Sequence, residues 1–220
     1  MELKRISGVI FDMDGTLLDS MPIWDNFGAN YLHACGISPR DDLAEKLTSL
    51  TVAEAADYLA ATYPLGKTPE EVAAGILSTA SALYASVKPK PGVMALLDTL
   101  RAAGIPMALA TLTDRPDVER VLGRLGVLPY LSHVFTCAEV GAGKDTPAIY
   151  EAALAALGTP KEETVVFEDA HYALKTAHNA GFPTAAVYDP SPYCRFAEGE
   201  KIATLAVRDY TALDLSPYLG

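Results

Sequence analysis

Apolar runs of strand length alternate with helix-length segments over most of the chain. Between residues 93 and 207, the helix-length segments end at a glycine and the apolar runs that follow end in polar residues. Short apolar runs bounded by turn signals are typical of buried strands, and their alternation with helices predicts a parallel sheet covered on both faces. Strands are expected at residues 6–12, 105–110, 133–137, 164–167, 184–188 and 203–207. Helices are expected between them, at residues 93–103, 115–125, 147–157 and 170–180.

Residues 19–88 break this alternation, because they are rich in alanine and contain no clear strand. Trp24, Phe27, Tyr31 and Leu32 fall at helical spacing. Two sequences of the kind that begins a helix follow, a capping box at 51–54 and a Thr-Pro pair at 68–69, whose helix should continue to about residue 87. The stretch therefore predicts a small all-helical insert.

Lys88-Pro89-Lys90-Pro91-Gly92 ends the insert and predicts a hinge. The first strand is thereby separated from the other strands of the sheet. The predicted fold is α/β, a doubly wound parallel sheet with an inserted all-helical domain. The expected boundaries are 1–18 and 89–220 for the sheet domain and 19–88 for the helical domain.

Composition restricts the classes of partner. The chain has 220 residues, half of them hydrophobic, and a formal net charge of −11. A negative field of this size disfavours nucleic acid and acidic membranes, so an anionic ligand would need a local positive site. No apolar run reaches the about 18 to 20 residues of a membrane span, and the first residues lack the apolar region of a signal peptide.

The three cysteines, Cys35, Cys137 and Cys194, have no metal-ligand spacing. An odd number of cysteines without a signal sequence predicts free thiols in a reducing compartment. We therefore expect a cytoplasmic protein. A monomer is the default expectation, and the sequence leaves the oligomeric state open.

The strongest chemical signal is a pair of acids directly after the first strand. Asp12 and Asp14 follow the run Gly8–Phe11, and Gly15 permits the turn that ends the strand. Two adjacent carboxylates repel each other unless a cation or a donor compensates them. Mg²⁺ is the natural compensator, because it prefers oxygen ligands and is often held by one or two carboxylates. An Asp-x-Asp sequence alone is more often an ordinary surface turn.

Three further polar signals lie at or after other predicted strands. They are Thr111, Lys144, and the pair Glu168 and Asp169. Each alone is more simply explained as a turn, a solvated side chain or a favourable first helical turn. Ligands of such sheets bind at the carboxyl ends of the strands, so all four signals are expected to share one crevice.

Together these residues resemble the motifs of the haloacid dehalogenase superfamily, in which most members transfer phosphoryl groups. The strand with Asp-Met-Asp-Gly-Thr at 12–16 resembles its first motif and Ala110-Thr111 its second. Lys144 resembles the third, and Glu168-Asp169 at the end of an apolar run the fourth. The position of the helical insert is similar to that of the cap domain in β-phosphoglucomutase and its phosphatase relatives. The resemblance covers essentially the whole chain.

The resemblance implies a role for each residue. Asp12 would be the nucleophile that forms an aspartyl-phosphate, and Asp14 would protonate the leaving oxygen and later deprotonate water. Mg²⁺ would be held by the Asp12 side chain, the main-chain carbonyl of Asp14 and Asp169, with Glu168 nearby. Thr111 and the amides after it would bind phosphate oxygens, and Lys144 would offset the carboxylates and contact the transferring group.

The same resemblance orders the candidate activities. Expulsion of a halide needs no proton, so the presence of Asp14 favours phosphate esters over carbon–halogen bonds. We expect a Mg²⁺-dependent phosphatase acting on a small phosphorylated metabolite. The alternative is a sugar phosphomutase of the β-phosphoglucomutase type, and a non-catalytic binding protein on the same fold is a third possibility.

Two departures count against the mutase. The cap-side histidine of that branch is replaced here by Trp24, and residues 47–59 contain no arginine or lysine. His171, just after Asp169, is a weaker candidate and is more simply a surface helix residue. The Pro- and Tyr-rich stretch 188–195 either lines the site or forms an irregular loop, and we favour the loop.

Overall fold

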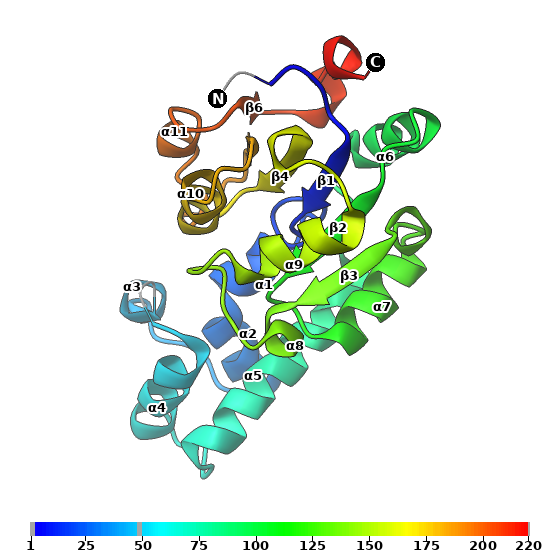
Figure 1. Cartoon of the computed structure of the whole chain (residues 1–220). Coiled ribbons are helices and arrows are strands. Elements are labelled where there is room, and N and C mark those ends of the chain that lie inside the picture. Colours follow the sequence, from blue (N-terminus) through cyan, green and yellow to red (C-terminus); the bar gives the residue numbers. More distant parts are fainter. Residues whose placement is uncertain (1–2, 48–49, 220) are drawn as a thin grey trace. The chain divides into compact units, whose positions relative to one another are not determined.

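A computed structural model describes residues 3–47 and 50–219 (Figure 1). Its centre is one parallel sheet of six strands in the order β3-β2-β1-β4-β5-β6. The strands are β1 (Gly8–Phe11), β2 (Met107–Thr111), β3 (His133–Thr136), β4 (Thr164–Glu168), β5 (Thr184–Val187) and β6 (Leu205–Val207). The strand order reverses direction between β1 and β4, which is the place where open α/β sheets bind ligands. The predicted fold class is confirmed.

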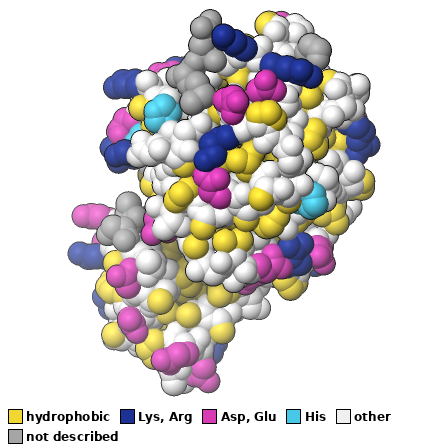
Figure 2. Space-filling model, in the orientation of Figure 1, with side chains coloured by type: hydrophobic (Ala, Val, Ile, Leu, Met, Phe, Trp, Pro, Cys, Tyr) yellow, Lys and Arg dark blue, Asp and Glu magenta, His cyan; other side chains and the backbone are white. Residues whose placement is uncertain are grey.

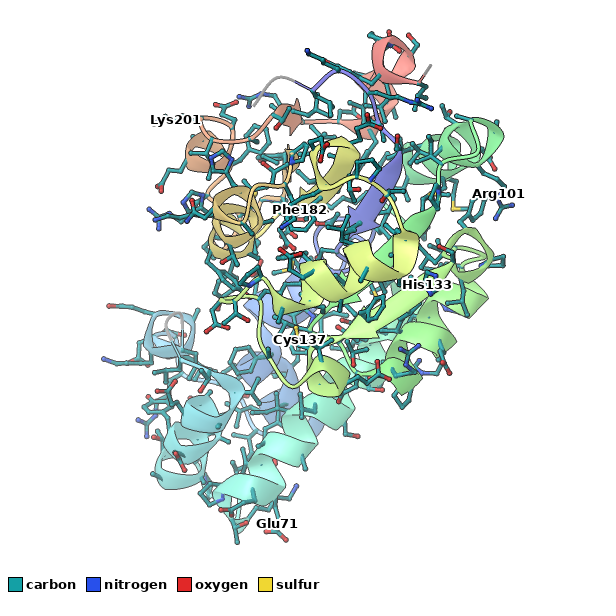
Figure 3. The ribbon with its side chains drawn as sticks, in the orientation of Figure 1. Glu71, Arg101, His133, Cys137, Phe182 and Lys201 are labelled. Carbon is teal, nitrogen blue, oxygen red and sulfur yellow. The ribbon has the colours of Figure 1, made fainter. Side chains whose placement is uncertain are left out.

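One face of the sheet packs against two helices, α9 (Ala148–Leu157) and α10 (His171–Asn179). Ile10 and Val166 point to this face, where the ring of the buried Tyr150 has its centroid 6.3 Å from that of Phe182. Phe182 is labelled in Figure 3. Each strand alternates its side chains between faces, so the neighbouring residues Phe11 and Phe167 point to the other side. All residues of β1, β2 and β4 are buried. This packing fixes the positions of the residues that follow at the carboxyl ends of these strands.

The C-terminal segment around the 3₁₀ turn Tyr210–Ala212 packs on the opposite face. The Phe11 and Phe167 rings lie 5.0 Å apart, and Tyr210 stacks on Phe167 at 6.4 Å. Helix α6 (Val93–Ala102) packs against the same segment. A Cβ atom on Gly92, which precedes α6 with φ of 85°, would lie 2.7 Å from the Thr211 amide nitrogen, so this approach requires glycine.

The predicted elements are present, with ends that differ by a few residues. Helices α6, α7 (Arg115–Arg124), α9 and α10 correspond to the four helices expected in the sheet domain. The second strand begins at Met107, after Pro106, and the irregular stretch 188–195 is confirmed as a loop. Three short helices were not predicted, α3 (Leu43–Leu47), α8 (Cys137–Val140) and α11 (Phe196–Gly199), since four or five residues are too few to show helical periodicity.

The chain divides into two compact units. The core unit comprises residues 1–19 and 88–220, and the helical unit comprises residues 20–87. The helical unit contains α1 (Met21–Asp25), α2 (Phe27–Ala34), α3 (Leu43–Leu47), α4 (Val52–Thr62) and α5 (Pro69–Leu83). Whether the two units are independent folding domains stays a prediction.

Local signals set the helix ends of the helical unit. Thr51 with Glu54 and Thr68 with Glu71 form the two capping boxes, at the starts of α4 and α5. Helix α5 ends at Leu83, earlier than expected, and the chain continues in a single 3₁₀ turn. The buried apolar faces of α2, α4 and α5 form the core of this unit. Trp24 is half-buried, and its indole nitrogen donates to the Tyr84 hydroxyl at 3.1 Å.

Among the described residues, no helix is long and apolar enough to cross a membrane. The face seen in Figure 2 carries acidic and basic side chains interspersed with apolar ones. All three cysteines are free thiols, and Cys137 and Cys194 are buried.

Candidate active site

Three carboxyl groups meet at the carboxyl ends of β1 and β4. The pairing of Phe11 with Phe167 places Asp12 beside Glu168, and the Asp12 amide donates to the Phe167 carbonyl at 3.0 Å. Asp12, Glu168 and Asp169 are 6%, 1% and 4% exposed, and each offers an oxygen within 4.8 Å of the others. Buried carboxylates at this separation are a fitting donor set for a hard divalent cation. We call this group the acid cluster.

Lys144 lies against the acid cluster from the loop between α8 and α9. Its Nζ donates to Asp12 Oδ1 and, at 2.8 Å, to Glu168 Oε2, and the residue is 3% exposed. The hydroxyl of Tyr150 donates to the same Glu168 oxygen at 3.2 Å. Glu168 therefore accepts two hydrogen bonds from buried donors on one oxygen.

Burial and mutual repulsion change the acidity of these groups. Burial, with Glu168 adding to it and Lys144 opposing it, raises the pKa of Asp12 from 3.8 to about 7. Burial and the neighbouring carboxylates also raise the pKa of Asp169 well above its usual value. Burial alone would lower the pKa of Lys144, but Asp12 and Glu168 raise it well above normal. One ammonium group thus faces three carboxyl groups, and a divalent cation would complete the charge balance.

Asp14 lies beyond the end of β1 and is only partly buried. Asp12 and Met13 separate it from the strand, and the chain turns directly after it at Gly15, whose φ is 80°. Its Oδ2 accepts a hydrogen bond of 2.6 Å from the Thr113 hydroxyl. The Thr113 amide in turn donates to Thr111 Oγ1 at 3.1 Å. The predicted residues Asp14 and Thr111, from two neighbouring strands, are therefore joined through Thr113.

Sequence reasoning missed three side chains of this region. Thr16 donates to Asp169 Oδ1 at 2.9 Å, Tyr150 contacts Glu168, and Thr113 contacts Asp14. Thr16 belongs to the same short run as Asp12 and Asp14, which was a usable signal. Tyr150 and Thr113 carried no such signal, because their partners lie 18 and 99 residues away in the chain.

The weaker candidates lie outside the acid cluster. His171 starts α10 and has Nε2 3.8 Å from Glu198 Oε2, which fits a helix residue paired with a neighbouring acid. Trp24 belongs to the helical unit.

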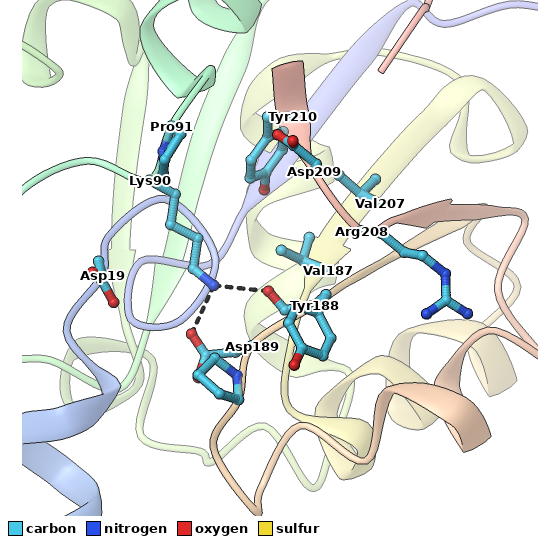
Figure 4. A pocket seen from close by; sticks show the side chains of 11 residues that line it. Asp19, Lys90, Pro91, Val187, Tyr188, Asp189, Val207, Arg208, Asp209 and Tyr210 are labelled. Carbon is cyan, nitrogen blue, oxygen red and sulfur yellow. Dashed lines mark hydrogen bonds and ion pairs between the residues drawn. The ribbon is translucent and has the colours of Figure 1, made fainter. Parts of the chain in front are cut away.

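The core unit also contains a cavity of about 300 Å³ beside the ends of β5 and β6 (Figure 4). Lys90 extends across it and donates to the Tyr188 carbonyl at 2.8 Å and to Asp189 Oδ2 at 2.6 Å. Asp189 is 3% exposed, and its other oxygen accepts from the Ser191 amide. This ion pair ties the predicted hinge to the loop after β5.

Comparison with known families decides the assignment. The family model of haloacid dehalogenase-like hydrolases matches residues 6–181, which include all the residues of the acid cluster and Lys144. The chain belongs to the haloacid dehalogenase-like hydrolases. The resemblance found in the motifs is thereby confirmed.

Similar proteins narrow the class of hydrolase. Over 197 residues the chain is 31% identical to hexitol phosphatase A of Escherichia coli, covering 88% of each protein. It is 27% identical to a phosphorylated carbohydrates phosphatase of Thermotoga maritima over 80% of this chain and 82% of that protein. A crystal structure of a proposed β-phosphoglucomutase from Thermotoga maritima superposes with a TM-score of 0.81 and 26% identity, covering 93% and 95% of the two chains. The chain is an enzyme of this family, a hydrolase of the same class as these phosphatases.

Proposed function

We propose that this hydrolase removes phosphate from a small sugar phosphate or sugar-alcohol phosphate, with Mg²⁺ in the acid cluster and Asp12 as the nucleophile. The observation that carries the proposal is the buried group of Asp12, Glu168 and Asp169 with Lys144 at the carboxyl ends of β1 and β4. Phosphoryl transfer depends mainly on positioning and on compensation of charge, and this arrangement is suited to both.

Mg²⁺, when bound, would neutralise charge on the phosphate and orient it for in-line attack. Asp12 and Asp169 would supply side-chain oxygens to the cation, and the main-chain carbonyl of Asp14 is a further candidate ligand. Glu168 accepts a hydrogen bond from Lys144, so its role would be to hold that ammonium group beside the cation site.

The reaction then has two displacements. A carboxylate oxygen of Asp12 attacks phosphorus, the bond from phosphorus to the ester oxygen breaks, and Asp14 gives its proton to that oxygen. Water next attacks the phosphoryl group on Asp12 and gives a proton to Asp14, and the Asp12 carboxylate is released with inorganic phosphate. Lys144 stabilises the negative charge on Asp12 and on the transferring group.

The class of substrate rests on the relatives. Two of the most similar proteins are named for hexitol and carbohydrate phosphates, and the chain covers more than four fifths of the length of each. A polyhydroxylated phosphate ester is therefore the first class to test.

A phosphomutase is the second candidate, favoured by the similar fold of the proposed β-phosphoglucomutase. Trp24 and the absence of arginine and lysine from residues 47–59 of the sequence count against it. Residues 48–49 of that stretch lie outside the described part of the chain.

Release of inorganic phosphate from a panel of phosphate esters tests the proposal. The panel contains hexitol, aldose and ketose phosphates and nucleoside monophosphates, each with Mg²⁺ and with a chelator. We expect metal-dependent release concentrated on the sugar and sugar-alcohol phosphates, and none from Asp12→Asn. Release confined to nucleotides would refute the sugar assignment. Conversion of a sugar 1-phosphate into its 6-phosphate without release would identify a mutase.

A further inference from the structure

Thr113 is a buried hydroxyl side chain directed at Asp14. The residue is 8% exposed, and its Oγ1 lies 2.6 Å from Asp14 Oδ2. Its backbone is fixed as well, because its amide donates to Thr111 Oγ1 at 3.1 Å. The hydroxyl is therefore presented to Asp14 by a backbone that is itself anchored at the end of β2.

The partners of the two aspartates differ in chemistry. Asp12 is contacted by the ammonium group of Lys144, which can only donate hydrogen bonds and therefore favours the ionised carboxylate. Asp14 is contacted by a hydroxyl, which can donate to a carboxylate and can also accept from a protonated carboxyl. A hydroxyl partner suits an acid that must carry a proton in one half of a reaction and lack it in the other.

We infer that Thr113 is a positioning residue that holds the Asp14 carboxyl group in one orientation through both half-reactions. This inference rests on the proposed function. In the first step the proton of Asp14 goes to the ester oxygen as the bond from phosphorus to that oxygen breaks. In the second step Asp14 takes a proton from the attacking water as the bond from phosphorus to Asp12 breaks.

A purely structural role for Thr113 is the competing explanation. Helix α7 begins two residues later, at Arg115, and its N-cap residue is Asp114. A structural hydroxyl would affect all substrates of the enzyme alike. A residue that positions the general acid affects only those substrates whose leaving group needs a proton.

The test compares two esters in three variants. The esters are the best sugar phosphate of the panel, whose alkoxide leaving group needs a proton, and p-nitrophenyl phosphate, whose phenolate leaves without one. The variants are Thr113→Val, Thr113→Ser and, as a control, Thr99→Val. In the wild type the Thr99 hydroxyl donates to the Ala95 carbonyl within α6. The measured quantity is kcat/KM, which reports the steps up to transfer onto Asp12.

We expect Thr113→Val to lower kcat/KM for the sugar phosphate roughly tenfold to a hundredfold, as for loss of a hydrogen bond to a charged group. The value for p-nitrophenyl phosphate should change less than about threefold, which also shows that the variant is folded. Thr113→Ser should restore most of the sugar phosphate value, and Thr99→Val should behave as the wild type. Equal losses on both esters, no loss, or no rescue by serine would overturn the inference.

Asp14→Asn separates failure of this inference from failure of the proposed function. If Asp14→Asn loses far more activity on the sugar phosphate than on the aryl ester while Thr113→Val does not, only the role of Thr113 is wrong. If Asp14→Asn shows no difference between the esters, Asp14 is not the general acid, and the inference about Thr113 falls with that role. The proposed function itself falls only if the wild-type enzyme releases no phosphate from the sugar and sugar-alcohol phosphates of the panel.

Discussion

Lys144 is the residue on which the charge balance of the site depends. Its ammonium group contacts the acid cluster, where it forms ion pairs with Asp12 and Glu168. Breaking a buried ion pair by removing one partner is costly, because the remaining charge is left uncompensated. The same ammonium group would stabilise negative charge as phosphate is transferred, so we expect both stability and catalysis to depend on it.

Substituting Lys144→Met is expected to lower kcat for phosphate release by roughly a thousandfold at saturating Mg²⁺, as for loss of a preorganised group at developing charge. Lys161→Met is a matched control in the core unit, because Lys161 lies before the amino end of β4 and pairs with the half-exposed Glu151. The control should keep its activity within about threefold, since exposed ion pairs contribute little. A Lys144→Met enzyme with wild-type kcat would contradict the role assigned to this residue.

How far the site could be predicted also becomes clear at this scale. The sequence allowed four residues to be expected together, Asp12, Lys144, Glu168 and Asp169. The three acids lie at or just after the carboxyl ends of β1 and β4, and Lys144 lies beyond β3, in the loop after α8. Thr113 and Tyr150 could not, because nothing local distinguishes them from other turn or helix residues. Their importance arises only when the parallel pairing of the strands brings distant segments together.

At the scale of elements, the loops are fixed by a few buried polar contacts. The clearest is Lys90 with Asp189, whose side chains are 12% and 1% exposed. It joins the segment before α6 to the loop after β5.

Replacing Asp189→Asn is expected to lower the free energy of unfolding by about 2–4 kcal/mol, since it leaves the Lys90 ammonium without its charged partner in a largely buried place. Glu200→Gln is the matched control, because Glu200 pairs with the exposed Arg208. It should cost less than about 1 kcal/mol. Urea unfolding of both variants measures the difference, and equal effects would show that burial does not strengthen the Lys90 pair.

The presence of most helices and strands was predicted correctly, whereas the residues at which they end were predicted less well. Helices α4 and α5 start where Thr51 and Thr68 predict, because a capping box is a local interaction within four residues. The end of α5 was misplaced, and α3, α8 and α11 were missed. Helix α8 owes its place to Thr136, a capping residue at the end of β3, and so depends on the sheet as much as on its own sequence.

At the scale of the whole molecule, a net charge of −11 is combined with several carboxyl groups buried in one place. The raised pKa of Asp12 means that the fold favours its neutral form, so its contribution to stability is present at low pH and is lost as the pH rises through about 7. Asp169 shifts in the same direction. A bound divalent cation would remove this penalty by favouring the ionised forms.

Mg²⁺ is therefore expected to stabilise the protein more at a pH of about 8 than at about 5, because protons compete with the cation for the acid cluster. At a concentration about 100 times its Kd the stabilisation should be about 2.7 kcal/mol. Thermal unfolding with Mg²⁺ and with a chelator at the two pH values measures this, and Asp169→Asn should show a much smaller Mg²⁺ effect. A Mg²⁺ effect that is equal at both pH values would refute cation binding at these carboxylates.

The most direct test of the account is the stereochemistry of hydrolysis at phosphorus. The substrate is the thiophosphate analogue of the best sugar phosphate of the panel, made chiral at phosphorus with one heavy oxygen isotope and hydrolysed in water labelled with another. The released thiophosphate then carries sulfur and three distinguishable oxygens, so its configuration can be determined. Transfer to Asp12 followed by transfer to water comprises two in-line displacements, so the account predicts retention of configuration. Inversion would mean a single direct attack by water and would contradict the role of Asp12 as the nucleophile.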